Sequence, residues 1–104
     1  MMKENETIRI NGEDLIEAVN EIEIMLTSID KIFSYFTYVD KRDTAFNEEL
    51  SRFIVDWKVL NRLARVRKIL SENFDDTLGD DDMDDLERAA HALEYWKKPG
   101  SKPK

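Results

Sequence analysis

The reactive residues of this chain limit the chemistry that it can perform. His91 is the single histidine, and cysteine is absent. Nucleophilic catalysis would therefore need His91 beside a serine, and no serine lies in the glycine-flanked turn that is typical of a nucleophile. The lack of cysteine excludes disulfides and thiol chemistry and fits a reducing compartment. We therefore predict that the protein is not an enzyme and that it is cytoplasmic.

Two acidic patterns have residue types that bind metals. Glu87, His91 and Glu94 share one side of a predicted helix, but a carboxylate-bridged two-metal site needs Glu-x-x-His pairs from two helices, and there is no second histidine. A calcium-binding loop that began at Asp76 would place Asp81 where glycine is required. The sequence therefore predicts no bound metal and no cofactor.

A run of carboxylates opens the first predicted helix: Glu13, Asp14, Glu17 and Glu21. Their spacing is similar to the first acidic motif of the MazG-like nucleotide pyrophosphohydrolases, which are all-α, magnesium-dependent enzymes. The resemblance implies that Glu72-x-x-Asp75 is the second motif. It covers only a handful of residues, and its carboxylates project away from the apolar stripe of their helix. A metal-dependent nucleotide hydrolase is therefore the least expected of three functions, and we assign no family.

Charge is divided between two neighbouring segments in a chain whose net charge is −7. Seven aspartates lie within eleven residues: Asp75, Asp76, Asp80, Asp81, Asp82, Asp84 and Asp85. Three bases share one face of the preceding predicted helix: Lys58, Arg62 and Arg65. The aspartates predict a contact surface for a basic partner, and the bases offer the alternative of phosphate contacts. Mutual neutralisation of the two segments within the fold remains a third interpretation.

The strongest pattern is an apolar stripe at steps of four and three, formed by Leu15, Val19, Ile22, Leu26, Ile29, Phe33 and Phe36. It predicts a helix over residues 12–39, capped by Asn11, whose stripe is the centre of the core. Three apolar residues lie nearly opposite the stripe: Ile24, Tyr35 and Tyr38. They are candidates for a second contact surface, for a partner or for a second copy of the chain.

Two further helices are predicted, over residues 44–72 and 80–97. The second helix follows a short polar break and carries two apolar stripes on different faces, so it should contact two neighbours. The third helix should begin at Gly79 or Asp80 and cover the second stripe, with Trp57 and Trp96 buried. Residues 1–10 are expected to be a flexible or extended lead-in, and residues 99–104 a flexible basic tail.

The predicted fold is therefore all-α: a long antiparallel helical hairpin plus a shorter third helix, in one domain over residues 11–98. The expected function is protein binding by a small acidic module that occupies a basic surface of another protein, as an inhibitor, an immunity-like protein or an adaptor. Colicin-type immunity proteins share this size, charge and helical class, but no motif is shared. A homodimer is a candidate, whereas contacts with nucleic acid or membrane are not expected.

Overall fold

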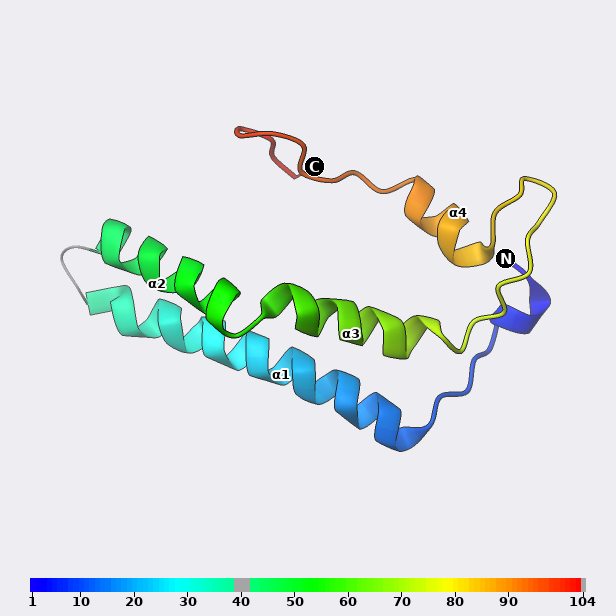
Figure 1. Cartoon of the computed structure of the whole chain (residues 1–104), viewed down its shortest axis with the longest axis horizontal. Helices are drawn as coiled ribbons and strands as arrows, with labels where there is room; N and C mark the ends of the chain where they lie inside the picture. Colours follow the sequence, from blue (N-terminus) through cyan, green and yellow to red (C-terminus); the bar gives the residue numbers. More distant parts are fainter. Residues whose placement is uncertain (39–41, 104) are drawn as a thin grey trace. The chain divides into compact units, whose positions relative to one another are not determined.

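The computed structural model describes residues 1–38 and 42–103, and these residues form an all-α fold, as predicted (Figure 1). Its helices are α1 (Gly12–Tyr35), α2 (Arg42–Asp56), α3 (Val59–Ser71) and α4 (Asp85–His91), with 3-10 turns η1 (Lys3–Asn5) and η2 (Phe36–Tyr38). The chain divides into two compact units: unit 1 is Met1–Arg9 with Asn73–Lys104, and unit 2 is Ile10–Glu72. Helix packing in unit 2 is that of a helical bundle.

Helix α1 begins where the sequence predicted. The Asn11 side chain accepts hydrogen bonds from the backbone N–H groups of Glu13 (2.8 Å) and Asp14 (3.4 Å), which would otherwise lack partners in the first turn. The helix ends at Tyr35 rather than near residue 39, because the backbone tightens there into η2. Val39, the predicted last residue, lies outside the described residues.

Contacts between the two arms of unit 2 establish an antiparallel hairpin (Figure 1). Glu17 pairs with Arg65, Glu21 pairs with Arg62, and the rings of Phe33 and Phe46 meet edge to face at 4.7 Å. As the position on α1 rises, the position of its partner falls, which is the signature of antiparallel chains. The predicted hairpin is therefore confirmed.

The second arm is not the continuous helix predicted over residues 44–72. It breaks between α2 and α3, where Lys58 adopts the left-handed conformation (φ 52°) and Arg62 Nε donates to the Trp57 carbonyl (2.8 Å). In an unbroken helix, Phe53 and Val66 would point about 140° apart, since each residue turns the helix by about 100°. The break brings both side chains into the buried interior of unit 2. We refer to α2 and α3 together as the second arm.

The prediction that the long apolar stripe of α1 forms the core was wrong for most of the stripe. Five of its seven residues are exposed and Ile29 is half-buried, whereas Phe36, at its end, is buried. The side chains of α1 that are buried are those of Ala18 and Met25, whereas Leu26, at the centre of the predicted stripe, is 63% exposed. Ala18 packs with Val66 and Ile69 of α3, and Ile10 packs against this cluster. The second arm therefore meets α1 along a line on one flank of the stripe, and much of the stripe is left at the surface. We call this line, along which Ala18 of α1 meets Val66 and Ile69 of α3, the contact line.

The third predicted helix is shorter than expected. Helix α4 begins after Asp84, not at residue 80, because Asp84 and Glu87 form a reciprocal capping box. It ends at His91, and residues 92–103 contain no helix. The predicted burial of the two tryptophans was also wrong: Trp57 is 50% exposed and Trp96 is 66% exposed.

Phe53 and Val55 provide a matched test of the contact line. Phe53 is 5% exposed and Val55 is 73% exposed, on the same helix. Phe53→Ala should lower the free energy of unfolding by about 3–5 kcal/mol, through lost burial and the cavity left behind. Val55→Ala should change it by less than about 0.5 kcal/mol. Urea denaturation followed by circular dichroism measures both values, and similar values for the two variants would contradict this packing.

A substitution at Lys58 tests the helix break, because a broken and a continuous second arm predict opposite changes in the free energy of unfolding. At a left-handed position, Lys58→Gly should raise the free energy of unfolding by up to about 1 kcal/mol, since glycine has no Cβ to clash. In a continuous helix, the same change should lower it by about 1 kcal/mol. Ala64→Gly, at an exposed position within α3, should lower it by that amount and serves as the control.

Candidate protein-binding surfaces

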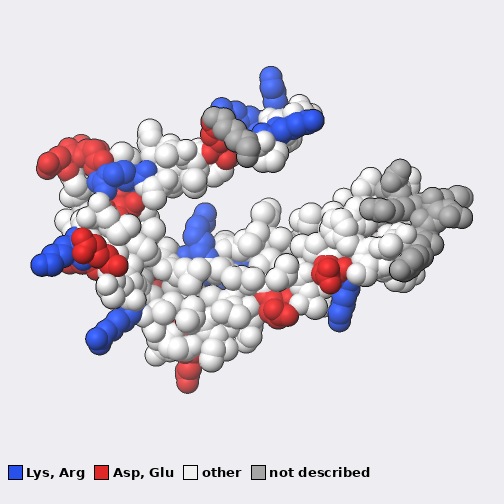
Figure 2. All heavy atoms as spheres, turned by 180° about the vertical axis from the view of Figure 1, so that it is seen from behind, with Lys and Arg blue, Asp and Glu red and all other residues white. Residues whose placement is uncertain are grey.

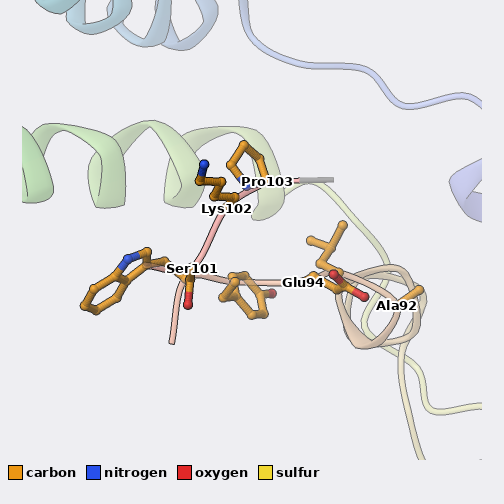
Figure 3. Close-up of a pocket in the computed structure, with 8 residues that line it drawn as sticks. Ala92, Glu94, Ser101, Lys102 and Pro103 are labelled. Atoms are coloured by element: carbon orange, nitrogen blue, oxygen red, sulfur yellow. The ribbon is translucent and has the colours of Figure 1, made fainter. Parts of the chain in front are cut away.

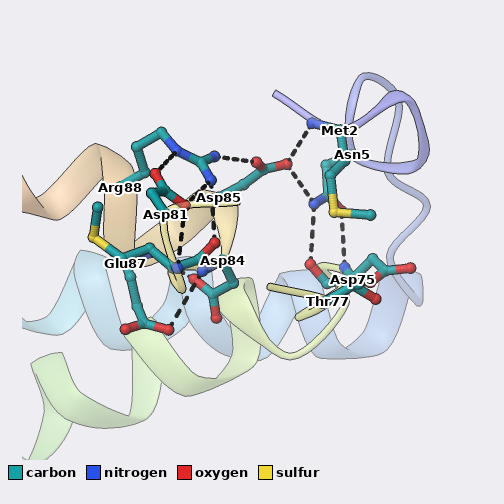
Figure 4. A network of polar contacts seen from close by, with 10 residues as sticks. Met2, Asn5, Asp75, Thr77, Asp81, Asp84, Asp85, Glu87 and Arg88 are labelled. Carbon is teal, nitrogen blue, oxygen red and sulfur yellow. Dashed lines mark hydrogen bonds and ion pairs between the residues drawn. The ribbon is translucent and has the colours of Figure 1, made fainter. Parts of the chain in front are cut away.

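The acidic segment belongs to a polar network in unit 1 that also holds the N-terminus (Figure 4). The Asn5 amide donates to the Asp75 carbonyl (3.0 Å) and to the Asp85 carboxylate (2.8 Å), and its oxygen accepts from the Asp75 N–H (2.8 Å). The backbone N–H of Met2 donates to the same Asp85 carboxylate (2.7 Å). Asn5 is only 4% exposed. The lead-in is therefore anchored at Met2 and Asn5.

Arg88 is the cation at the centre of this network. It makes a bidentate pair with the Asp81 carboxylate, with Nε and one terminal nitrogen at 2.7 and 2.8 Å, and its other terminal nitrogen lies 2.8 Å from Asp85 Oδ1. It also donates to the Met83 carbonyl (3.1 Å). An added Cβ at Gly79 would lie 2.7 Å from the guanidinium, so glycine leaves room for this pair. Bidentate arginine–carboxylate pairs fix geometry as well as charge.

These contacts lower the pKa of three aspartates. Hydrogen bonds from Arg88 hold the pKa of Asp81 well below its usual range, and hydrogen bonds from Asn5 and Met2 lower the pKa of Asp85. Hydrogen bonds from Thr77 lower the pKa of Asp75. In each case the contacts favour the charged carboxylate over the protonated one. The network is therefore stable at pH values at which these aspartates are ionised.

The structure sorts the seven predicted aspartates into two groups. Four are engaged within unit 1, as ion-pair partners, turn residues or the cap of α4: Asp75, Asp81, Asp84 and Asp85. Three are exposed, and among the described residues no hydrogen bond or ion pair involves their side chains: Asp76, Asp80 and Asp82. We call these three the free aspartates. Acidic and basic side chains also adjoin one another on the visible surface of unit 1 (Figure 2).

The predicted basic patch is largely neutralised, but not by the acidic segment. Arg62 lies 2.9 Å from the Glu21 carboxylate, with both side chains mostly buried, and Arg65 pairs with Glu17. The same pairs engage two carboxylates of the hydrolase-like motif. Lys58, the third residue of the patch, is exposed at the helix break and belongs to neither ion pair.

The second predicted contact surface is only partly exposed. Ile24 is half-buried, Tyr35 is exposed, and the side chain of Tyr38 lies outside the described residues. Tyr35 instead packs edge to face on Phe36 (4.9 Å).

Sequence reasoning missed Asn5 and Arg88 as organisers of the acidic segment. The i, i+3 spacings of Asp84 with Glu87 and of Asp85 with Arg88 could have revealed the cap and one ion pair. No local pattern signals Asn5, whose partners lie 70 and 80 residues away.

An open pocket of about 490 Å³ lies in unit 1 between residues 92–96 and 101–103 (Figure 3). Its lining includes Tyr95 and Trp96, with Glu94 and Lys102 as the charged groups. Among residues 1–38 and 42–103, no three histidine, aspartate or glutamate side chains are placed to hold a metal ion. Within the same described ranges, none of the helices combines the length and apolar character needed to cross a bilayer.

The Asp81–Arg88 pair predicts a specific change in titration. Arg88→Ala should move the titration midpoint of Asp81 upward, toward the ordinary aspartate value of about 4, in carbon-detected NMR. Asp75 is the internal control, since its pKa is lowered mainly by Thr77 and should stay low. Because the folded pKa values are lowered, the network stabilises unit 1 fully above about pH 4, and this stability is lost as pH falls through the folded values. An unchanged Asp81 midpoint would contradict the assigned pair.

The chain matches no protein-family model, and comparisons with curated proteins and with solved structures give no significant match.

Proposed function

We propose that this protein is a small acidic protein-binding module that occupies a basic surface of another protein, as an inhibitor or an adaptor does. The observation that supports this proposal is the division of the acidic segment. The engaged aspartates hold the segment in place through hydrogen bonds and ion pairs. The side chains of the free aspartates Asp76, Asp80 and Asp82 take no part in that network. We infer that the free aspartates contact the partner.

The electrostatic argument concerns association rate more than affinity. The presence of three exposed carboxylates within seven residues is not explained by the stability of unit 1, because like charges repel and none of the three pairs with a cation among the described residues. They would attract a basic protein during encounter and align it, an effect that weakens as salt screens the charges. Anchoring by Asn5 and Arg88 reduces the entropy that the loop would lose on binding.

The two other functions considered have less support. Contact with nucleic acid would need Arg62 and Arg65, and both already pair with glutamates of α1. A metal-dependent hydrolase would need Glu17 and Glu21 as free ligands, and these are the same glutamates. A cytoplasmic location remains a prediction that depends on the cysteine-free composition.

The proposal predicts that Asp76→Asn, Asp80→Asn and Asp82→Asn together leave folding nearly intact and slow association. The partner is first identified by passing host lysate over the immobilised protein. Association rates are then measured by surface plasmon resonance at about 10 and about 150 mM salt. The triple variant should associate several-fold more slowly at low salt and show a smaller difference at high salt.

A matched control removes three negative charges elsewhere: Glu13→Gln, Asp56→Asn and Glu72→Gln, all exposed positions of unit 2. This variant should associate at nearly the wild-type rate if the position of the charges matters. Equal slowing by both variants would attribute the effect to net charge alone. A wild-type rate for the first variant at low salt would refute the proposed role of the free aspartates.

A further inference from the structure

The described residues of unit 2 include thirteen large apolar side chains that are exposed. Nine of them, each between 41% and 74% exposed, form what we call the apolar face: Leu15, Val19, Ile22, Leu26 and Phe33 of α1, Ile54 of α2, and Leu60, Leu63 and Leu70 of α3. They are independent of the acidic segment, which belongs to unit 1.

Helical geometry places these residues on one side of the hairpin. Successive residues are rotated by about 100° about the helix axis. Measured in this direction of rotation, the residues of the apolar face on α1 lie about 40–100° from Ala18. Leu63 and Leu70 lie about 40–60° from Val66 in that same sense. Because the arms are antiparallel, the same sense of rotation points to the same side of the two-helix layer. Uncharged atoms dominate the hairpin surface visible in Figure 2, where charged groups are scattered.

The opposite side of the layer carries charged pairs and one exposed apolar ring, that of Tyr35, which shares the direction of Glu17 on α1. The Glu17–Arg65 and Glu21–Arg62 pairs are rotated about their helix axes in the opposite direction from the contact line, so they lie on the side away from the apolar face. A shallow pocket farther along the same side is lined by charged residues of both arms and by three apolar residues: Lys31, Glu49, Arg52 and Asp56, with Ile32, Phe53 and Trp57. Unit 2 is therefore an amphipathic layer with one charged side and one apolar side.

A layer of two helices needs a second layer to cover its apolar side. The apolar face exposes on the order of 800 Å², taking about half of roughly 150–200 Å² for each side chain. This exceeds the largest apolar patch of an ordinary monomer, about 300–600 Å². It also equals the roughly 800 Å² that each partner contributes to a standard interface.

We propose that the apolar face is a homodimer interface, in which two hairpins pack face to face about a two-fold axis. The area is that of a stable dimer, and the nine residues are all uncharged. Arg67 is exposed and lies about 100° from Val66 in the same sense, so it belongs to the rim of this face. A second copy supplies an apolar surface of the same length and helix spacing, as an isologous contact requires. The product is a bundle of two hairpins, which buries side chains that a single hairpin leaves exposed.

The test compares two substitutions on α1 in the full chain. Leu26→Glu places a charge on the apolar face. Ile16→Glu places the same charge about 80° from Leu26 around α1, beyond the edge of the face, at a similarly exposed position (60%). Sedimentation equilibrium from about 1 to about 100 μM should show a wild-type dimer. Leu26→Glu should raise the dissociation constant by about a hundredfold or more, because it buries an unpaired charge, and Ile16→Glu should leave it nearly unchanged.

Two outcomes overturn the proposal. Monomeric wild-type protein throughout this range would show that the apolar face is not a homodimer interface. A dimer that resists Leu26→Glu, or that is lost in Tyr35→Glu instead, would place the interface elsewhere. These outcomes leave the function proposed for the free aspartates untouched, because partner association is measured separately.

Discussion

The contact line between α1 and the second arm buries few side chains, and this constraint governs the rest of unit 2. Two packed helices each present one narrow strip to the other, so the remaining apolar residues face outward unless another layer covers them. The small side chain of Ala18 allows close approach beside Val66 and Ile69. Glutamates and arginines close one flank of this line, and the long apolar stripe borders the other. The amphipathic character of the layer follows from where this line falls.

The break at Lys58 maintains the contact line. Without it, the apolar positions of α2 and α3 would point in different directions, since the apolar stripe changes face near Trp57. One residue in a left-handed conformation resets the helix phase, so that Phe53, Val66 and Ile69 all become buried. The Arg62 side chain satisfies the Trp57 carbonyl that the break releases. A local backbone cost of about 1–2 kcal/mol is thus offset by burial at several positions.

Unit 1 is stabilised in a different way, by a buried amide and a shared guanidinium rather than by a large apolar cluster. This arrangement places ionised aspartates next to the free ones and anchors the segment that carries them. If two copies associate through the apolar face, each particle carries two acidic segments. Two weak contacts on one particle can raise overall affinity when the partner offers two basic sites at a matching distance.

The sequence by itself determined the all-α class, the Asn11 cap and the antiparallel hairpin, because these depend on local periodicity, capping and a short connection. It also located the acidic and basic residues. Only the tertiary structure decided which flank of the α1 stripe is buried, since adjacent flanks of a helix differ by a rotation that periodicity alone does not fix. It likewise decided that Arg62 and Arg65 pair with α1, and that Asn5 joins Asp75 and Asp85, because these contacts connect residues 41 to 80 positions apart.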